Sequence, residues 1–200
     1  MPEVRMPTQK RSIEKRNIII EKGFELMCEE GYYNTNTTQI AKYAGVSTGI
    51  IYQYFNDKKD IFIEGVKNYS EKIMFPLVNI FEKSAIKNDT LPELLKDVIK
   101  QFIKTHTISK KAHEELIAMS HLDDDIAEIF KKSELKTTEK LVSLLKENGF
   151  EDNNLNEKVH ICINLIDNYC HEMVYHKHES MNYKAMEDLI IKLIIDTIKM

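Results

Sequence analysis

The sequence has 200 residues, of which 42% are hydrophobic and 30% charged, a composition typical of a globular chain and unlike that of a disordered or membrane protein. With only 6 Gly and 4 Pro, the chain has too few turn residues for a β-sandwich or a barrel and favours long helices. The net charge of -4, taken over the whole chain, argues against a strong binder of nucleic acid, because such domains are usually basic.

Hydrophobic periodicity and helix-terminal residues predict an all-α chain of about nine helices, with no stretch of sustained period-2 alternation. The first helix is expected to start at Ser12 and to stop at Gly31, and Thr37 and Thr38 are the expected N-caps of the second. Pro76 is expected to bend or break the fourth helix. The predicted helices cover residues 12–30, 39–44, 47–54, 57 onward, 91–106, 110–121, 124–148, 155–178 and 183–199.

Charge is distributed unevenly along the chain. Residues 1–60 contain 9 Lys or Arg and 8 Asp or Glu, a net charge of +1, whereas residues 61–200 contain 19 and 24, a net charge of -5. All three arginines (Arg5, Arg11 and Arg16) lie in the first 16 residues. This asymmetry indicates different roles for the two ends, although a basic N-terminus alone is also compatible with a solvated tail.

The compartment is expected to be the cytoplasm. Three widely spaced cysteines (Cys28, Cys162 and Cys170) without a C-x-x-C pair are typical of free thiols in a reduced protein. The first 17 residues are polar and basic, unlike a signal peptide. The most apolar segment, residues 189–195, is short and contains Lys192, so no membrane-spanning segment is predicted.

Residues 38–58 predict two short helices joined by a tight turn. Gly45 can adopt the positive φ that the turn requires, and Ala41 is small where the helices cross. This layout is typical of a helix-turn-helix, whose second helix enters the major groove of DNA, although an ordinary αα-hairpin has the same pattern. The apolar residues expected to hold the crossing are Ile40, Ala44, Val46 and Ile51.

A longer set of residues resembles the N-terminal signature of the TetR (tetracycline-repressor-like) family over about residues 10–60. The residues are Glu30-Gly31-Tyr32, Thr38, Ile40-Ala41, Ala44-Gly45-Val46-Ser47, Gly49, Tyr52, Tyr54-Phe55 and Lys58. Beyond residue 60 only the length and the helical pattern are similar. One departure is Gly23, where the family commonly has Ala; it is expected to cost less than about 1 kcal/mol of helix propensity.

The resemblance implies a homodimeric transcriptional regulator, usually a repressor, that binds a palindromic operator in double-stranded DNA and is released by a small-molecule effector. It also implies a helix-turn-helix domain over residues 10–70 and a C-terminal helical domain for effector binding and dimerisation over residues 71–200. No enzymatic motif is found. The competing interpretations are an enzyme, which lacks such support, and a helical dimerisation module that does not bind DNA.

Residue roles in DNA binding follow from the family positions and from side-chain chemistry. Thr38 is placed to bind a phosphate, Ile50 to meet a thymine methyl, and Gln53 to pair with adenine. Because no Lys or Arg lies between Lys42 and Lys58, an operator leaning toward A·T pairs is expected. Phe55 is expected in the core. The full set of expected DNA-binding residues is Arg11, Arg16, Thr38, Ser47, Thr48, Gly49, Ile50, Tyr52, Gln53, Tyr54 and Lys58, with Arg5 and Lys15 adding basic charge.

The last two predicted helices are apolar on more than one face, which favours burial against a partner subunit in a four-helix dimer interface. A purely intramolecular core is the alternative. The residues expected at the interface are Cys162, Ile166, Tyr169, Cys170, Met173, Ile190, Ile191, Ile194 and Ile198.

An effector pocket is expected among the middle helices, although each of its candidate residues is equally compatible with an ordinary core position. No cofactor is expected. No metal site is expected either, because His171, His176 and His178, with Glu172 beside them, lack the i, i+4 spacing that places two imidazoles on one helical face. The candidate pocket residues are Phe102, His106, His113, Met119, Tyr169 and Met173.

Overall fold

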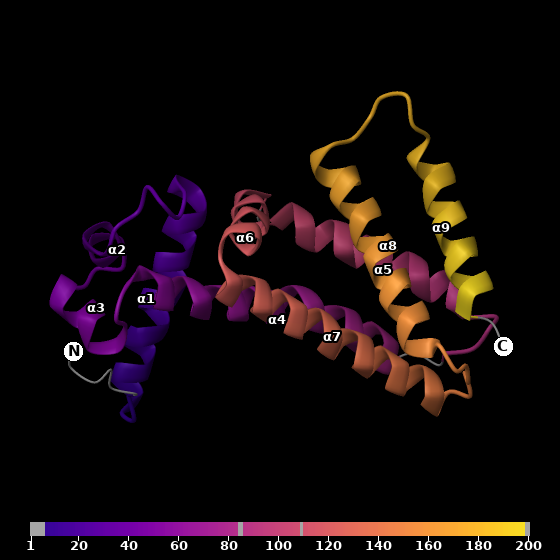
Figure 1. Ribbon diagram of the computed structural model, residues 1–200, viewed down its shortest axis with the longest axis horizontal. Coiled ribbons are helices and arrows are strands. Elements are labelled where there is room, and N and C mark those ends of the chain that lie inside the picture. Colours follow the sequence, from indigo (N-terminus) through magenta and orange to yellow (C-terminus); the bar gives the residue numbers. More distant parts are fainter. Residues whose placement is uncertain (1–6, 84–85, 109, 199–200) are drawn as a thin grey trace. The chain divides into compact units, whose positions relative to one another are not determined.

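The computed structural model describes residues 7–83, 86–108 and 110–198, apart from the side chains of residues 71–77 and 108. Within these ranges all regular secondary structure is helical (Figure 1), which confirms the predicted all-α class. The helices are α1 (Lys10–Glu30), α2 (Thr37–Tyr43), α3 (Thr48–Tyr54), α4 (Lys58–Glu82), α5 (Leu91–Ile108), α6 (Lys110–Leu122), α7 (Asp124–Glu147), α8 (Leu155–Tyr175) and α9 (Tyr183–Ile198).

The starts of the first two helices differ from the predictions. The N-cap of α1 is Gln9 rather than Ser12. Helix α2 is capped by Asn36, whose side chain accepts hydrogen bonds from the backbone N–H groups of Thr38 and Gln39 at 3.0 Å, while the Gln39 side chain accepts one from the Asn36 N–H at 2.9 Å. This reciprocal capping box satisfies otherwise unpaired N–H groups and starts the helix one residue before the threonines.

Helix α4 passes through Pro76 without a break. Gly31, Gly45 and Gly149 have φ values of 91°, 68° and 86°, which confirms the expected stop after α1 and the expected turn after α2. Positive φ is accessible to glycine at little cost.

The chain divides into two compact units, one formed by residues 1–69 and 111–130 and the other by residues 70–110 and 131–200. The first unit therefore contains residues 111–130, which lie in the C-terminal domain of the predicted division. The reason is a shared apolar core: Leu116, Met119 and Ile126 are buried in one cluster with Ile40 and Phe62. This distribution could not be read from the order of the elements along the chain.

The core of the first unit depends on two close helix approaches. A Cβ atom on Gly65 of α4 would lie 2.4–2.5 Å from the Cδ2, Cβ and Cγ atoms of Phe24 on α1. A Cβ on Gly23 would lie 2.7 Å from the Cγ2 of Ile61 and 3.0 Å from that of Ile40. Glycine at position 23 is thus required by packing, which explains the departure from the Ala common in the family. Phe55 is buried, as expected.

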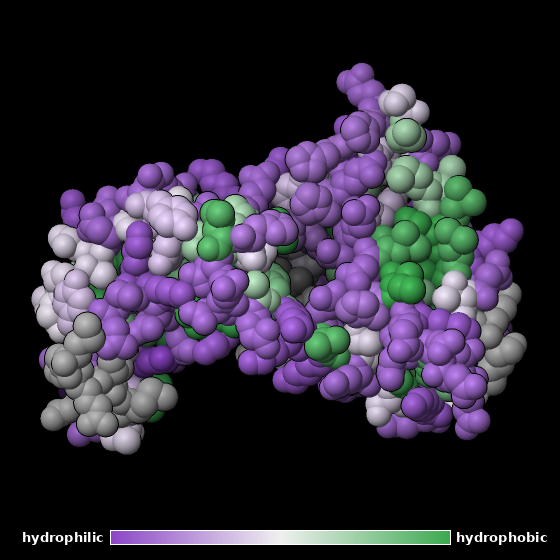
Figure 2. All heavy atoms as spheres, in the orientation of Figure 1, coloured by the Kyte–Doolittle hydropathy of each residue, from purple (hydrophilic) through white to green (hydrophobic). Residues whose placement is uncertain are grey.

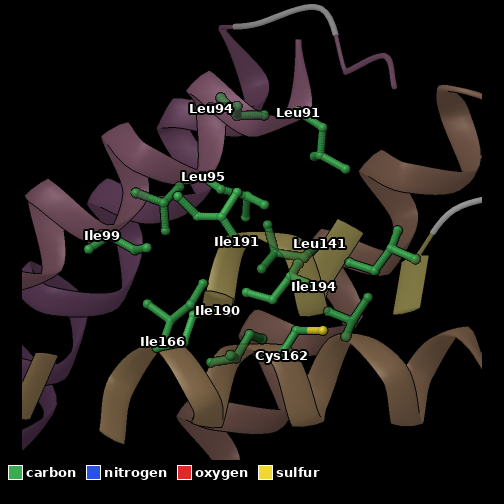
Figure 3. Packing of buried hydrophobic residues seen from close by; sticks show 14 of the residues in the cluster. Leu91, Leu94, Leu95, Ile99, Leu141, Cys162, Ile166, Ile190, Ile191 and Ile194 are labelled. Carbon is green, nitrogen blue, oxygen red and sulfur yellow. The ribbon is translucent and has the colours of Figure 1, made fainter. Parts of the chain in front are cut away.

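The second unit is built around α5, α8 and α9, whose apolar side chains converge on one another (Figure 3). Of the nine residues predicted at the dimer interface, eight are buried inside this unit and the ninth packs against its core. Both α8 and α9 turn their most continuous apolar face toward α5, and periodicity alone does not show which face is internal. The residues concerned are Cys162, Ile166, Tyr169, Cys170, Ile190, Ile191, Ile194 and Ile198, with Met173 partly buried.

Candidate nucleic-acid interface

Helices α2 and α3 are joined by a turn that leaves one face of α3 on the core. In the turn, the Val46 N–H donates to the Ala41 carbonyl at 2.9 Å and the Gly45 N–H donates to the Lys42 carbonyl at 3.2 Å. Ile40 of α2 and Ile51 of α3 are fully buried. The crossing is therefore held by backbone hydrogen bonds and two buried isoleucines, and the remaining face of α3 is free to meet a ligand.

The exposed face of α3 carries polar residues that the sequence singled out. Ser47, Gly49, Tyr52 and Gln53 are exposed and Thr48 is half-buried, while Thr38 is exposed at the start of α2. We call these six residues the α3 surface. The Tyr52 hydroxyl lies 3.0 Å from the Thr37 Oγ1, which fixes the ring beside the start of α2. Thr37 was not predicted in this role, because the contact depends on the relative register of two helices.

Two of the α3 residues that were predicted to contact DNA lie partly in the core of the first unit. Ile50 and Tyr54 are half-buried and pack against the core of the first unit. They lie four residues apart and therefore share one face of the helix. The predicted contact of Ile50 with a thymine methyl stays a prediction for the part of its side chain that is exposed.

Lys58 is engaged by the protein itself. Its Nζ donates to the carbonyl oxygens of Tyr32 at 2.6 Å and Thr35 at 2.7 Å, and it lies 4.4 Å from the centre of the Tyr32 ring. Burial lowers the pKa of Lys58, and neighbouring Asp57 only partly offsets this. The ammonium group therefore ties the start of α4 to the loop after α1, a structural role that the sequence signature did not reveal.

The basic residues predicted near the N-terminus to contact DNA have different surroundings in the structure. Arg16 is half-buried, with its Nη2 3.1 Å from the Glu64 carboxylate and its guanidinium 5.1 Å from the centre of the Phe55 ring. Arg11 is exposed on α1. Arg5 lies outside the described residues. Arg11 is thus the better placed of the two described arginines for a phosphate, whereas Arg16 stabilises the first unit.

Helix α6 and the start of α7 are anchored to the loop after α1 and to the start of α4 by residues that the sequence did not mark. The Tyr32 N–H donates to the Glu115 carboxylate at 2.6 Å, and Lys59 pairs with Asp123 at 2.8 Å and Asp125 at 2.7 Å. Hydrogen bonds to these two carboxylates raise the pKa of Lys59. The pairs join residues more than 60 positions apart, so no local pattern could have found them.

The second unit contains a cavity of about 50 Å³. Of the six candidate pocket residues, Phe102 lines it. His106, Tyr169 and Met173 belong to the same unit without lining the cavity, and His113 and Met119 belong to the first unit. The predicted pocket residues therefore do not form one site. The cavity lining is Phe81, Leu91, Leu95, Val98, Phe102, Thr137, Leu141, Leu145, Val159, Cys162, Ile163, Ile166, Ile194 and Ile198.

His106 is a buried imidazole with both ring nitrogens facing acceptors. Its Nδ1 lies 2.9 Å from the Phe102 carbonyl oxygen and its Nε2 lies 3.3 Å from the Asp167 carboxylate. Burial lowers its pKa, but the hydrogen bonds to Asp167 and Phe102 outweigh this, so the pKa is raised. The charged form of the ring is stabilised by the Asp167 carboxylate, which lies 3.3 Å from Nε2.

The histidines near the end of α8 form ring contacts rather than a metal centre. The His171 ring lies 4.7 Å from that of Tyr175 and 5.4 Å from that of His176, and Glu172 accepts a hydrogen bond from Tyr183 at 2.8 Å. Among the described residues, no group of three or more His, Cys, Asp or Glu side chains is arranged to hold a metal ion. No helix of the described chain has the length and apolarity needed to cross a membrane.

Comparison with known proteins identifies the family. Residues 19–64, which contain α2, α3 and the turn between them, match the family described as bacterial regulatory proteins, tetR family. The helix-turn-helix segment of this chain is therefore of the tetR type. It is 53% identical over 55 residues to the HTH-type transcriptional regulator HbdR of Aromatoleum sp. (strain CIB), a match that covers 28% of this chain and 24% of that relative. The TetR family consists of transcriptional regulators rather than enzymes.

Solved structures extend the likeness to the whole TetR-type fold. A TetR-family transcriptional regulator from Mesorhizobium loti MAFF303099 superposes with a TM-score of 0.75 at 16% identity, covering 94% of this chain and 98% of that one. The transcriptional regulator FadR from Bacillus subtilis, solved in complex with stearoyl-CoA, superposes with a TM-score of 0.63 at 22% identity, covering 91% and 98%. At these identities the likeness concerns the fold. The chain matches about a quarter of the length of its curated relative HbdR.

Proposed function

We propose that this TetR-family protein is a homodimeric repressor that binds a palindromic operator through α3 and is released by a small-molecule effector. The observation that carries the proposal is the α3 surface: an exposed polar helix face held in place by a buried helix-turn-helix crossing. Its site of action is the cytoplasm, where the operator DNA lies.

The chemistry of the α3 surface supports an operator that leans toward A·T pairs. Gln53 is exposed and can pair with adenine N6 and N7, whereas α3 carries no Arg for the bidentate contact with guanine. Thr38 lies exposed at the start of α2, where its hydroxyl and the helix N-terminus can bind a phosphate. Tyr52 is 49% exposed and can reach the DNA backbone. Arg11 adds long-range attraction to the phosphates.

Exposed apolar residues on α8 and α9 support dimerisation. Ile161 is 63% exposed, Leu189 58% and Leu193 56%, and all three lie opposite the buried faces of their helices. Figure 2 shows an apolar patch where Figure 1 draws α9. Contiguous apolar patches on a soluble protein usually mark an interaction surface. The proposed interface therefore uses these three residues in place of the buried set predicted from sequence.

An effector site in the second unit is supported by the apolar cavity and by the fold. The FadR neighbour was solved in complex with stearoyl-CoA, which supports an effector site in this fold. In this chain the cavity is lined from α4, α5, α7, α8 and α9. Helices α4 and α7 contribute residues to both units. A ligand that changes the packing of these helices in the second unit can therefore affect the first unit through the same continuous helices.

The test is selection of random duplex DNA on the full-length protein, followed by sequencing of the retained fraction. The expected result is a palindromic consensus whose half-sites are rich in A·T pairs beneath α3. Gln53→Ala is expected to relax specificity at one base pair per half-site, because one bidentate contact discriminates by about 1–3 kcal/mol. Gln101→Ala on α5 is the matched control and is expected to leave the consensus unchanged. Absence of any enriched sequence would refute DNA recognition, and a G·C-rich consensus would refute the assignment of bases.

A further inference from the structure

The cavity of the second unit has an unusually uniform wall. Its described lining consists of aliphatic side chains and two phenylalanines, together with Thr137 and Cys162. The Thr137 hydroxyl donates to the Ser133 carbonyl at 2.9 Å, so its proton is not available to a ligand. Burial raises the pKa of the Cys162 thiol to about 11, so the thiol is uncharged at neutral pH. Among the described lining residues none is charged.

Such a wall excludes water and charged groups from the cavity. A buried water molecule needs two to four polar partners, and apolar cavities without them stay dry. A charge would lose its hydration without gaining a counter-ion. In Figure 3 Leu95, Leu141, Cys162, Ile166 and Ile194 point toward one another from four helices. The occupant that this surface favours is therefore a hydrocarbon group.

The size of the cavity limits the shape of that group. A volume of about 50 Å³ is roughly a third of the ~150 Å³ cavity that accepts benzene, and it holds about four water-sized groups. A ring does not fit without displacing the wall. The last few carbons of a narrow unbranched chain do fit, with the polar head of the same molecule remaining outside.

We propose that the effector of this protein carries an unbranched aliphatic chain whose terminal four or so carbons occupy this cavity. The inference deepens the proposed function and rests on it, since it assigns the ligand class of the effector site. The cavity does not specify the polar head group of the effector, because no described lining side chain can recognise a polar group. A carboxylate, an alcohol or a larger carrier on the chain would present the same buried part.

The probes are the unbranched 1-alkanols from ethanol to 1-octanol, which vary the chain from shorter to longer than the cavity while keeping one uncharged head, and sodium octanoate, which changes the head alone. Binding to the full-length protein is measured by calorimetry and thermal shift. Affinity is expected to rise about fourfold per methylene, the equivalent of ~0.8 kcal/mol for each buried CH₂, and to level off once the cavity is full. Octanoate is expected to bind like the alcohol of equal chain length, and benzene is expected not to bind.

Three variants locate the binding. Leu141→Ala removes part of the wall and is expected to admit benzene, whereas Cys162→Leu fills the cavity and is expected to weaken octanol binding at least tenfold. Leu94→Ala is the matched control, since Leu94 is buried in the same core without lining the cavity. Thermal unfolding of each variant shows which are folded, and the Leu141→Ala and Leu94→Ala pair decides the question if Cys162→Leu does not fold.

The inference is overturned if affinity does not depend on chain length, or if Leu141→Ala and Leu94→Ala change ligand binding alike. Operator binding by the wild-type protein is measured on the same preparation. Loss of chain binding with intact operator recognition refutes this inference alone. Chain binding without any sequence-selective DNA binding refutes the proposed function instead.

Discussion

Gly65 offers a prediction in which two physical effects of one methyl group oppose each other. Replacing Gly65 by Ala in the interior of α4 favours the helix by about 1 kcal/mol. The new Cβ would, however, lie 2.4–2.5 Å from three atoms of Phe24, including the Phe24 Cβ, which cannot move without the backbone of α1. Overpacking of this kind costs about 1–3 kcal/mol. With three such contacts we take the upper value, so the net loss of unfolding free energy is about 2 kcal/mol.

The assay is thermal unfolding at fixed protein concentration, because the stability of a dimer depends on concentration. A loss of about 2 kcal/mol corresponds to a fall in Tm of about 4–8 °C for a chain of this length. Gly49→Ala is the matched control, since its Cβ would have no neighbour closer than the Ser47 Oγ at 4.0 Å and is expected to leave Tm unchanged or slightly raised. Because Gly49 lies on the α3 surface, the same variant is expected to weaken operator binding. If Gly65→Ala is as stable as the wild type, the close approach of α1 and α4 is wrong.

Three further predictions follow from individual contacts. Lys58→Met removes the ammonium group from the Tyr32 and Thr35 carbonyls and is expected to lower the free energy of unfolding by about 1.5–3 kcal/mol. Urea unfolding measures this change, and unchanged stability would refute the structural role of Lys58. The raised pKa of His106 adds stability that is fully present below its ordinary value near 6.5 and is lost as the pH rises through the raised value. His106→Gln is therefore expected to be more destabilising at pH 5.5 than at pH 8.5, and an equal effect at both would contradict the imidazolium. Leu193→Asp is expected to halve the mass found by light scattering, whereas Leu135→Asp, on the exposed part of α7, is expected to leave it unchanged; a dimeric Leu193→Asp protein would refute the proposed interface.

The helix-turn-helix was predictable because its constraints are local. Gly45 must adopt positive φ, Ala41 must be small, and Ile40 and Ile51 must be buried, and all of these lie within a dozen residues. The same local pattern did not distinguish Ile50, which packs on the core, from Tyr52, which is exposed. With only seven residues, α3 has too few turns for periodicity to settle which side of the helix a borderline position occupies.

Several contacts that the sequence did not predict depend on distant parts of the chain. Glu115 meets the Tyr32 N–H across 83 residues, and Lys58 turns back to carbonyls of the loop after α1 rather than outward. In α8 and α9, Ile166 and Ile161 belong to the same apolar helix, but only the packing against α5 makes the first internal and the second exposed. An apolar composition predicts burial without specifying the partner.

The whole-chain net charge of -4 is the sum of +1 in the first segment and -5 in the second, so it did not indicate the uneven distribution of charge along the chain. The structure sharpens this further, because Arg16 and Lys58 are committed to intramolecular contacts. Recognition is thus expected to depend more on the polar α3 surface and less on phosphate charges than the number of basic residues indicates.

The central claim is that α3 reads DNA, and the binding of the selected duplex by the double variant Tyr52→Ala/Gln53→Ala tests it most directly. Affinity is measured between 50 and 200 mM salt, with thermal unfolding confirming that the variant is folded. For the wild type we predict a linear fall of log affinity with log salt and strong preference over a scrambled duplex. The variant is predicted to keep its Tm and to lose that preference. A folded variant that still prefers the selected duplex as strongly as the wild type would contradict the account.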